Sequence, residues 1–327
     1  MSNRELHGVI VPVITPIDEK ENVDESAFRG ILRRLIDAGA HCIFVGGSAG
    51  EGPLLVDAQW RRMVEIAFDE VGGELPLLAG TIDTSARRVC DKVTILKRIG
   101  YRYFVLTPTY YVANKAPSEH LRLFGQAKEA AGKMEMVAYN IPQCTGSILA
   151  VDMVCEMAKR GWVRYCKESS GDLKYLKSLI RKGKSVGLNV LAGDELIMGQ
   201  GLLAGAKGIV PVCANYDPQR YIRLYEAGSR GDRKAVAEQM PALLQIREVC
   251  LLSGASWLAG MKYAMSVLGY GSGKCVSPLE SAETKRKARI DALIKTHQND
   301  AVTPPRTVCY PASTAARKKP RQTRERK

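Results

Sequence analysis

The sequence has 327 residues, of which 46% are hydrophobic and 25% are charged, so the chain can bury a large core and general disorder is excluded. The formal net charge of +14 is typical of nucleic-acid-binding proteins, but half of it lies in residues 301–327, which hold eight Lys or Arg and one Glu. No apolar run approaches the ~18 residues of a membrane span, and the first residues lack the apolar segment of a secretory signal.

The basic residues 299–327 are rich in Pro, Ser and Thr and cannot build a core, so we expect a disordered tail there rather than a nucleic-acid arm. The nine cysteines are scattered, odd in number and never spaced as C-x-x-C, which favours a reduced, cytoplasmic protein. The four histidines form no HExxH motif, and no paired acids stand at ligand spacing. We therefore expect no metal, no cofactor, no nucleic-acid partner and no membrane partner.

Along the chain, short apolar runs alternate with amphipathic segments. The runs do not alternate apolar with polar residues, as expected for parallel strands that are buried on both faces. The segment 24–39 between the first two runs predicts a helix, with Asp24 as N-cap and Gly39 at its C-terminal end. The predicted strands lie at 8–15, 41–47, 76–81, 103–108, 134–140, 162–168, 188–193 and 207–212.

Eight strand–helix units over about 200 residues predict an α/β fold, namely a (β/α)8 TIM barrel, at residues 1–215. A doubly wound sheet is the alternative, but its first strand is usually followed by a Gly-rich phosphate loop, which is missing here. After the last strand only helical patterns follow, so residues 216–298 are predicted to form a helical C-terminal extension on the barrel.

Catalytic residues of such barrels lie where the strands end. Lys167 ends the sixth predicted strand and Tyr139 ends the fifth, so an amine and a phenol can meet over one pocket. A lysine in a partly apolar pocket has a lowered pKa, and its neutral amine can form a Schiff base with a ketone. The alternative is an ion pair between Lys167 and Glu168, or another acid at the barrel rim, and position alone does not decide between the two.

The segments CKESSGDL (166–173), YNIPQCTG (139–146) and GGSAGE (46–51) together resemble the dihydrodipicolinate synthase / N-acetylneuraminate lyase family of class I aldolases. The segments GVIVPVITP (8–16) and AGDELIMGQGLLAGAKGIVPV (192–212) fit the same family. The resemblance covers about residues 6–295 in the same order and spacing.

The resemblance implies a catalytic group of four residues. Lys167 matches the Schiff-base lysine, Tyr139 the phenol that relays protons, and Ser48 the hydroxyl of that relay. Tyr110 matches a tyrosine that neighbouring subunits exchange across a dimer interface, with Tyr111 as the alternative. Substrate-binding positions are expected at strand ends and in the matching loops, namely Gly47, Ala49, Thr81, Cys144, Ser169, Gly193, Glu195 and Val210.

Three positions depart from the family pattern. Ala49 stands where a second hydroxyl usually binds the keto acid's carboxylate, although backbone N–H groups of the loop can still hold it. Cys144 stands where the synthases have an arginine for the carboxylate of aspartate semialdehyde, and a thiol cannot form that charge-assisted pair. Leu196 stands where sialate lyases have an acid for the sugar hydroxyls. At the position before it, Glu195 retains the residue of the family pattern.

The leading hypothesis is therefore a Schiff-base lyase that joins or separates pyruvate and an aldehyde, with a 2-keto-3-deoxy sugar acid or related 2-oxo acid as substrate. We expect a homo-oligomer, either a dimer or a tetramer. Dihydrodipicolinate synthase, N-acetylneuraminate lyase and a 2-oxo acid dehydratase that uses the same imine are the alternatives. The sequence 46–50 formally reads G-x-S-x-G, but the helix that a hydrolase requires at the serine is predicted only near Asp57. A non-catalytic scaffold would need none of Lys167, Tyr139 and Ser48.

Overall fold

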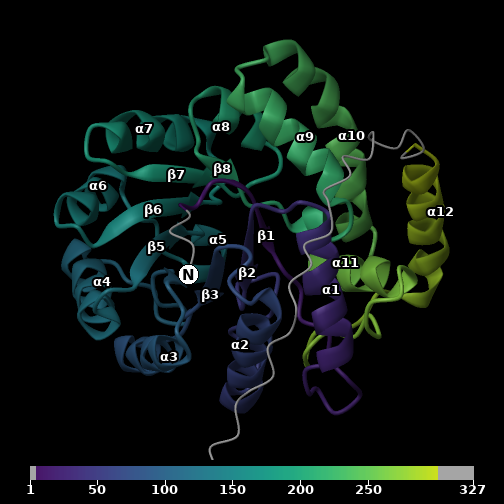
Figure 1. Cartoon of the computed structure of the whole chain (residues 1–327), viewed down its shortest axis with the longest axis horizontal. Coiled ribbons are helices and arrows are strands. Elements are labelled where there is room, and N and C mark those ends of the chain that lie inside the picture. The colour runs from purple at the N-terminus through teal and green to yellow at the C-terminus, as the bar shows by residue number, and fades with distance from the viewer. Residues whose placement is uncertain (1–4, 301–327) are drawn as a thin grey trace, which may run out of the picture.

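The computed structural model describes residues 5–300 of the chain. Eight parallel strands close into a barrel in which each strand pairs with the next along the chain and β8 pairs with β1 (Figure 1). The helices surround this barrel, which confirms the predicted (β/α)8 TIM barrel with a C-terminal helical extension. The strands are β1 (Gly8–Pro12), β2 (Cys42–Val45), β3 (Leu77–Gly80), β4 (Tyr103–Leu106), β5 (Glu135–Asn140), β6 (Val163–Glu168), β7 (Asn189–Ala192) and β8 (Gly208–Ile209).

The helices begin and end where the sequence has caps and glycines. In α1, the Asp24 carboxylate accepts a hydrogen bond from the N–H of Ala27 at 3.0 Å, and Gly39 beyond the C-terminus has a φ of +83°, which favours glycine. The helices are α1 (Glu25–Asp37), α2 (Asp57–Val71), α3 (Ala86–Ile99), α4 (Pro117–Ala131), α5 (Pro142–Thr145), α6 (Val151–Lys159), α7 (Leu173–Lys184), α8 (Met198–Leu203), the 3-10 turn η1 (Val212–Asn215), α9 (Pro218–Ser229), α10 (Arg233–Leu251), α11 (Trp257–Val267) and α12 (Thr284–Asp300).

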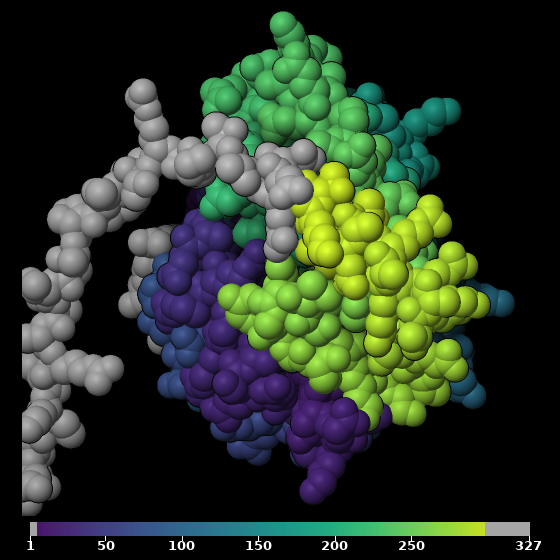
Figure 2. Space-filling model, turned by 90° about the vertical axis from the view of Figure 1, so that its right-hand side faces the viewer, coloured from purple at the N-terminus to yellow at the C-terminus, as the bar shows by residue number. Residues whose placement is uncertain are grey.

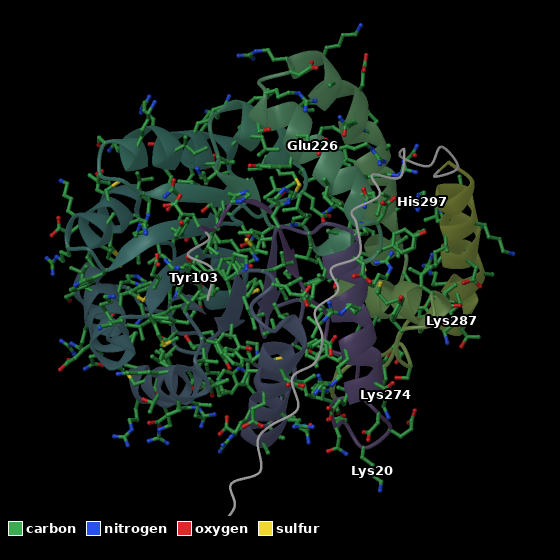
Figure 3. The ribbon with its side chains drawn as sticks, viewed as in Figure 1. Lys20, Tyr103, Glu226, Lys274, Lys287 and His297 are labelled. Carbon is green, nitrogen blue, oxygen red and sulfur yellow. The ribbon has the colours of Figure 1, made fainter. Side chains whose placement is uncertain are left out.

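Helix α9 completes the ring of helices because it follows β8 and packs against β1 and α8. We therefore propose to count the barrel to Ser229 instead of residue 215, and to call α10–α12 the C-terminal extension. Figure 2 shows the end of this extension beside the N-terminal part of the chain. There the Lys274 ammonium lies 2.8 Å from Glu19 Oε2, and Figure 3 shows Lys274 and Lys20 on this same side. The predicted tail lies, from residue 301 on, outside the described residues.

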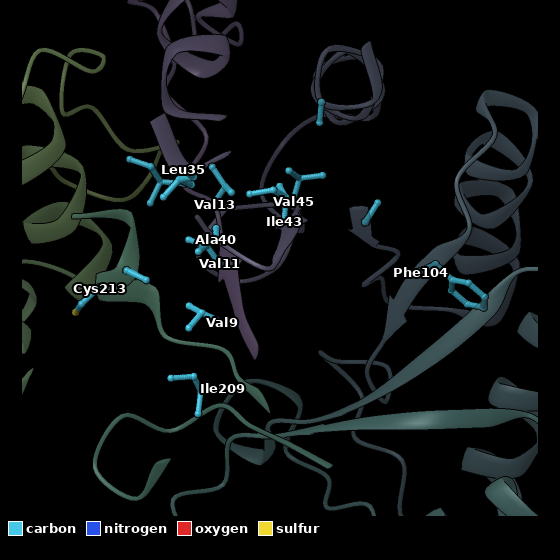
Figure 4. Packing of buried hydrophobic residues seen from close by; sticks show 14 of the residues in the cluster. Val9, Val11, Val13, Leu35, Ala40, Ile43, Val45, Phe104, Ile209 and Cys213 are labelled. Carbon is cyan, nitrogen blue, oxygen red and sulfur yellow. The ribbon is translucent and has the colours of Figure 1, made fainter. Parts of the chain in front are cut away.

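Two layers of apolar side chains hold the barrel together. The outer layer lies between strands and helices and includes Val9, Val11, Ile43 and Val45 (Figure 4). The inner layer fills the barrel itself with residues of the opposite strand face, among them Phe44, Tyr139 and Tyr165. Since side chains alternate along a strand, Lys167 shares the inner face with Tyr165, two residues before it. In residues 5–300 no helix is both long and apolar enough to cross a membrane.

Candidate active site

A cavity of about 270 Å³ opens at the carboxyl ends of the strands. Eight of the predicted site residues line it, together with residues of the C-terminal extension. The strand ends and the loops after β2, β5, β6, β7 and β8 contribute Ser48, Ala49, Tyr139, Lys167, Ser169, Gly193, Glu195 and Val210. The structure therefore brings together side chains that lie up to 162 residues apart in the sequence, counted from Ser48 to Val210.

Lys167 lies at the floor of this cavity. It pairs with Tyr139 in the register of β5 and β6, and its Nζ atom lies 4.1 Å from the centroid of the Tyr139 ring and 5.2 Å from that of Phe44. Only 6% of the residue is exposed. No hydrogen-bond or ion-pair partner for Nζ is present among residues 5–300. The amine is therefore buried, unpaired and directed into the cavity.

The alternative ion pair between Lys167 and Glu168 is not formed. Glu168 points to the outer face of β6, where its Oε2 accepts from Asn140 Nδ2 at 2.7 Å and its Oε1 accepts from the N–H of Ser170 at 2.6 Å. The hydroxyl of Ser170 donates to the same Oε1. Asn140 in turn accepts from the N–H of Leu149, so Glu168 fixes the loop after β5. Sequence reasoning assigned no role to Asn140.

Burial determines the protonation of the central pair. It lowers the pKa of Lys167 from 10.5 to about 7, because the charged ammonium is poorly solvated there, while the nearby Cys144 acts weakly in the opposite direction. Burial raises the pKa of Tyr139, and the neighbouring hydroxyls of Ser169 and Ser48 offset part of that shift. At neutral pH about half of the Lys167 amines are therefore neutral and nucleophilic, whereas the Tyr139 phenol is protonated.

The loop after β2 lines the cavity with Ser48 and Ala49. Within the described part of the chain, no acceptor contacts the N–H groups of Ser48 and Ala49. The loop is held from outside by Glu51, whose carboxylate forms an ion pair with Lys262 of α11 and accepts from the N–H of Val276 at 2.8 Å. Glu51 is thus a structural hydrogen-bond acceptor, and sequence reasoning did not identify its cationic partner Lys262.

Gly193 must be a glycine because of its neighbours. A Cβ atom at this position would lie 2.2 Å from Ser169 Oγ and 2.9 Å from Lys167 Cε. Ser169 Oγ is itself buried and has no partner of good geometry among the described residues, so it is available to a ligand. Glu195 accepts from the N–H of Cys213 at 2.9 Å and from its thiol at 3.2 Å, and burial raises its pKa.

Four predicted residues do not line this cavity. The Thr81 hydroxyl is fully buried and donates to the carbonyl of Val105 at 3.2 Å, which leaves it no route to a substrate. Gly47 belongs to the loop after β2 but does not line the cavity. A Cβ atom at this position would lie 2.7 Å from the Phe44 ring. Cys144 and Tyr110 line a second cavity of about 190 Å³, which shares Ser48 with the first. Sequence reasoning could not separate the two cavities, because both lie at strand ends.

Residues of the extension were missed by sequence reasoning. Arg247 and Leu251 of α10 and Trp257 of α11 line the mouth of the cavity. No local pattern identifies them, since only the packing of α10 and α11 over the strand ends brings them there. In residues 5–300 no group of three or more His, Cys, Asp or Glu is arranged to hold a metal ion.

The hydrolase reading of residues 46–50 has no support in this geometry. Ser48 lies in a series of turns, and the next helix begins only at Asp57. No histidine lines either cavity that contains Ser48. A serine without a helix start and without a neighbouring base lacks the groups that activate such a nucleophile.

Comparisons with known proteins identify the family of the chain. A family model described as the dihydrodipicolinate synthetase family matches residues 5–297. An uncharacterized DapA-like lyase of Halobacterium salinarum is 31% identical over 289 residues, 88% of this chain and 92% of the relative. N-acetylneuraminate lyase 2 of Escherichia coli is 30% identical over 295 residues (89% and 93%), and 4-hydroxy-tetrahydrodipicolinate synthase of Methanothermobacter thermautotrophicus is 29% identical over 273 residues (83% and 95%).

Solved structures show the same fold. Dihydrodipicolinate synthase of Bacteroides thetaiotaomicron superposes with a TM-score of 0.85 at 26% identity, covering 90% of this chain and all (100%) of that one. The Escherichia coli prophage protein YagE, solved in complex with pyruvate, superposes with a TM-score of 0.84 at 25% identity, covering 89% and 98%. The chain therefore belongs to the dihydrodipicolinate synthetase family and is a lyase of the class I, pyruvate-dependent type that this family comprises.

Proposed function

We propose that the protein forms a Schiff base between Lys167 and pyruvate and so makes or breaks a carbon–carbon bond to an aldehyde. The observation that carries this proposal is the buried, unpaired Lys167 amine with a pKa of about 7, next to the Tyr139 phenol. A lysine with the ordinary pKa of 10.5 would be neutral in roughly one molecule in three thousand at pH 7, whereas about half of the Lys167 amines are neutral there.

In the proposed reaction, the neutral Lys167 amine attacks the carbonyl carbon of pyruvate, and loss of water gives a protonated imine. Removal of a proton from the adjacent methyl group gives an enamine, which attacks the aldehyde carbon, and water then releases the product. Tyr139 and Ser48 move the protons. The free N–H groups of Ser48 and Ala49 hold the carboxylate of pyruvate, a role that their position on the cavity wall supports.

The Tyr139→Phe variant tests the proton relay. We expect it to form the pyruvate adduct with Lys167 but to turn over about 10²-fold more slowly, the usual scale for loss of a positioned proton-transfer group. Tyr165→Phe is the matched control, because Tyr165 lies deeper in the same barrel interior and, among residues 5–300, its hydroxyl accepts only from the N–H of Leu6. Unchanged turnover of Tyr139→Phe would remove this phenol from the relay.

For the substrate, we propose a 2-keto-3-deoxy sugar acid or a related 2-oxo acid. Ser169 Oγ, which has no partner among the described residues, and Glu195 offer polar groups on the cavity wall, and no cation stands at Cys144. Dihydrodipicolinate synthase, N-acetylneuraminate lyase and a dehydratase that uses the same imine remain the alternatives.

Substrate choice gives a direct test of the Cys144 interpretation. We expect measurable cleavage of a 2-keto-3-deoxy sugar acid and poor condensation of pyruvate with aspartate semialdehyde. Absence of the charge-assisted hydrogen bond at position 144 reduces kcat/KM for aspartate semialdehyde by about ten- to two-hundred-fold. Both substrates are compared under one set of conditions. A ten-fold preference for aspartate semialdehyde would mean that a different cation holds its carboxylate and that our interpretation of Cys144 is wrong.

We also propose that the chain forms a homo-oligomer, a dimer or tetramer, and that Tyr111 is the tyrosine exchanged between subunits, in place of Tyr110. Tyr110 is partly buried in its own subunit's second cavity, whereas Tyr111 is 94% exposed and has a φ of +73°. Val112 beside it is 73% exposed. Sedimentation should give an oligomer for the wild type and smaller species for Tyr111→Asp, with Lys115→Asp as control. A monomeric wild type would contradict the proposal.

A further inference from the structure

Arg247 is a cation at the cavity and has no partner in the described part of the chain. It lies on α10 and lines the cavity of Lys167 beside Leu251 and Trp257. From residue 5 to residue 300, no carboxylate lies within 4.0 Å of its guanidinium and no hydrogen bond engages it. Arg34, another partly buried arginine, donates by contrast to the carbonyls of Asn215 and Tyr216, each at 2.7 Å.

Glu195, an acid of the cavity wall, forms no ion pair with Arg247. Both oxygens of Glu195 accept from Cys213, one from its N–H and one from its thiol. The Arg247 charge still reaches Glu195, since it offsets part of the rise that burial causes in the Glu195 pKa. Arg247 therefore contributes a positive potential inside the cavity without being held by an ion pair.

The surroundings of Arg247 suit an anionic ligand. Leu251 and Trp257 are 52% and 39% exposed, so apolar side chains flank the guanidinium at the mouth of the cavity. Apolar neighbours exclude water and strengthen a charge-assisted hydrogen bond. The planar guanidinium presents paired N–H donors that match carboxylate and phosphate oxygens.

The position of Arg247 separates it from the groups proposed to hold pyruvate. Ser48 and Ala49 belong to the loop after β2, and the carboxylate of pyruvate uses their N–H groups. Arg247 comes from the extension that closes the cavity from outside the barrel. A substrate that is anchored on Lys167 and reaches the mouth would bring the end of its aldehyde half to Arg247.

We propose that Arg247 determines specificity by binding a terminal anionic group, a carboxylate or a phosphate, on the aldehyde half of the substrate. This proposal rests on the proposed Schiff-base function and narrows its substrate class to molecules with an anion at both ends. Aspartate semialdehyde stays a poor substrate, because the ammonium group next to its carboxylate cancels the charge that the guanidinium attracts. The second anion is recognised by the extension and not at the position of Cys144, which lies on the other cavity.

The test measures pyruvate condensation with two matched pairs of aldehydes. Glyceraldehyde 3-phosphate is compared with glyceraldehyde, and succinic semialdehyde with butyraldehyde, in the wild type and in Arg247→Gln, Arg247→Lys and Arg233→Gln. Arg233 begins the same helix, is exposed and does not line the cavity. We expect Arg247→Gln to lose about 10- to 100-fold in kcat/KM for one anionic aldehyde and less than about 3-fold for its neutral partner.

The pattern across the variants decides the outcome. Arg247→Lys should recover part of the loss, and Arg233→Gln should resemble the wild type. The aldehyde pair in which Arg247→Gln lowers kcat/KM for the anionic member identifies the bound anion as phosphate or carboxylate. Equal losses for anionic and neutral aldehydes, or no loss for either anion, would overturn the proposal for Arg247. Borohydride trapping of pyruvate on each variant is the separate readout: absence of trapping in the wild type would refute the Schiff-base function itself.

Discussion

Pyruvate and sodium borohydride should together attach a reduced adduct to Lys167 alone, and Lys167→Ala should lose at least about 10⁴-fold in turnover, the scale on which enzymes depend on a covalent nucleophile. The physical reason is that an imine forms only with a neutral amine, and burial provides one here by lowering the pKa of Lys167 to about 7. Peptide mass spectrometry of the trapped protein identifies the labelled lysine.

The pH dependence of trapping follows from the same shift. Because the pKa of Lys167 is lowered, the neutral amine is populated above about pH 7 and is lost as the pH falls below it. The initial rate of adduct formation should therefore rise between pH 6 and 8 and level off above, with a midpoint near 7. A folded protein with an unlabelled Lys167, or a rate that rises only toward pH 10, would contradict the mechanism. The matched control is Lys174→Met, which removes an exposed lysine and should leave trapping unchanged. Lys92 is unsuitable as a control, because it forms a buried ion pair with Asp83.

Removal of the cation in the Glu51–Lys262 pair is the change expected to affect stability most. Both side chains are almost completely buried, 0% and 2% exposed, and Glu51 also accepts from the N–H of Val276. Lys262→Met leaves the Glu51 carboxylate buried without its counter-charge, which costs about 3–5 kcal/mol in the free energy of unfolding. Urea denaturation of the full chain, followed by circular dichroism, measures this difference.

Two further variants make this prediction specific. Glu51→Gln combined with Lys262→Met removes both charges and keeps an acceptor for the Val276 N–H, so the double variant should be more stable than Lys262→Met alone. Lys274→Met breaks the exposed pair with Glu19, and an exposed pair contributes only about 0–1 kcal/mol. If Lys262→Met destabilises the chain no more than Lys274→Met does, the buried pair does not hold the loop after β2 as we infer.

The loop after β2 also connects the extension to the chemistry. Ser48 and Ala49, which line the cavity, stand three and two positions before Glu51. Glu51 has a φ of +53°, an unusual value for a residue with a side chain, and its contacts with α11 and Val276 hold it there. The extension therefore acts on both ends of the proposed substrate, through Glu51 on the pyruvate side and through Arg247 at the mouth.

The sequence by itself determined the fold and the central pair of side chains. Eight non-alternating apolar runs separated by amphipathic segments predict parallel strands that are buried on both faces, and the missing Gly-rich phosphate loop after the first strand favours a barrel over a doubly wound sheet. Strand ends of a barrel converge, so Lys167 and Tyr139 could be placed together from their positions alone. These conclusions rest on local periodicity and on the regular geometry of the barrel.

Only the tertiary structure decided which strand-end residues face the cavity and what closes it. Thr81 lies at a strand end as Tyr139 does, yet its hydroxyl donates a hydrogen bond to the carbonyl of Val105. Cys144 and Tyr110 also lie near strand ends but line a second cavity. Arg247 lies 37 residues after Val210 of the cavity wall, and Lys262 lies 211 residues after its partner Glu51. The physical reason is that helices of the extension have no fixed register relative to the barrel, so their contacts arise from side-chain packing between distant segments and leave no local pattern in the sequence.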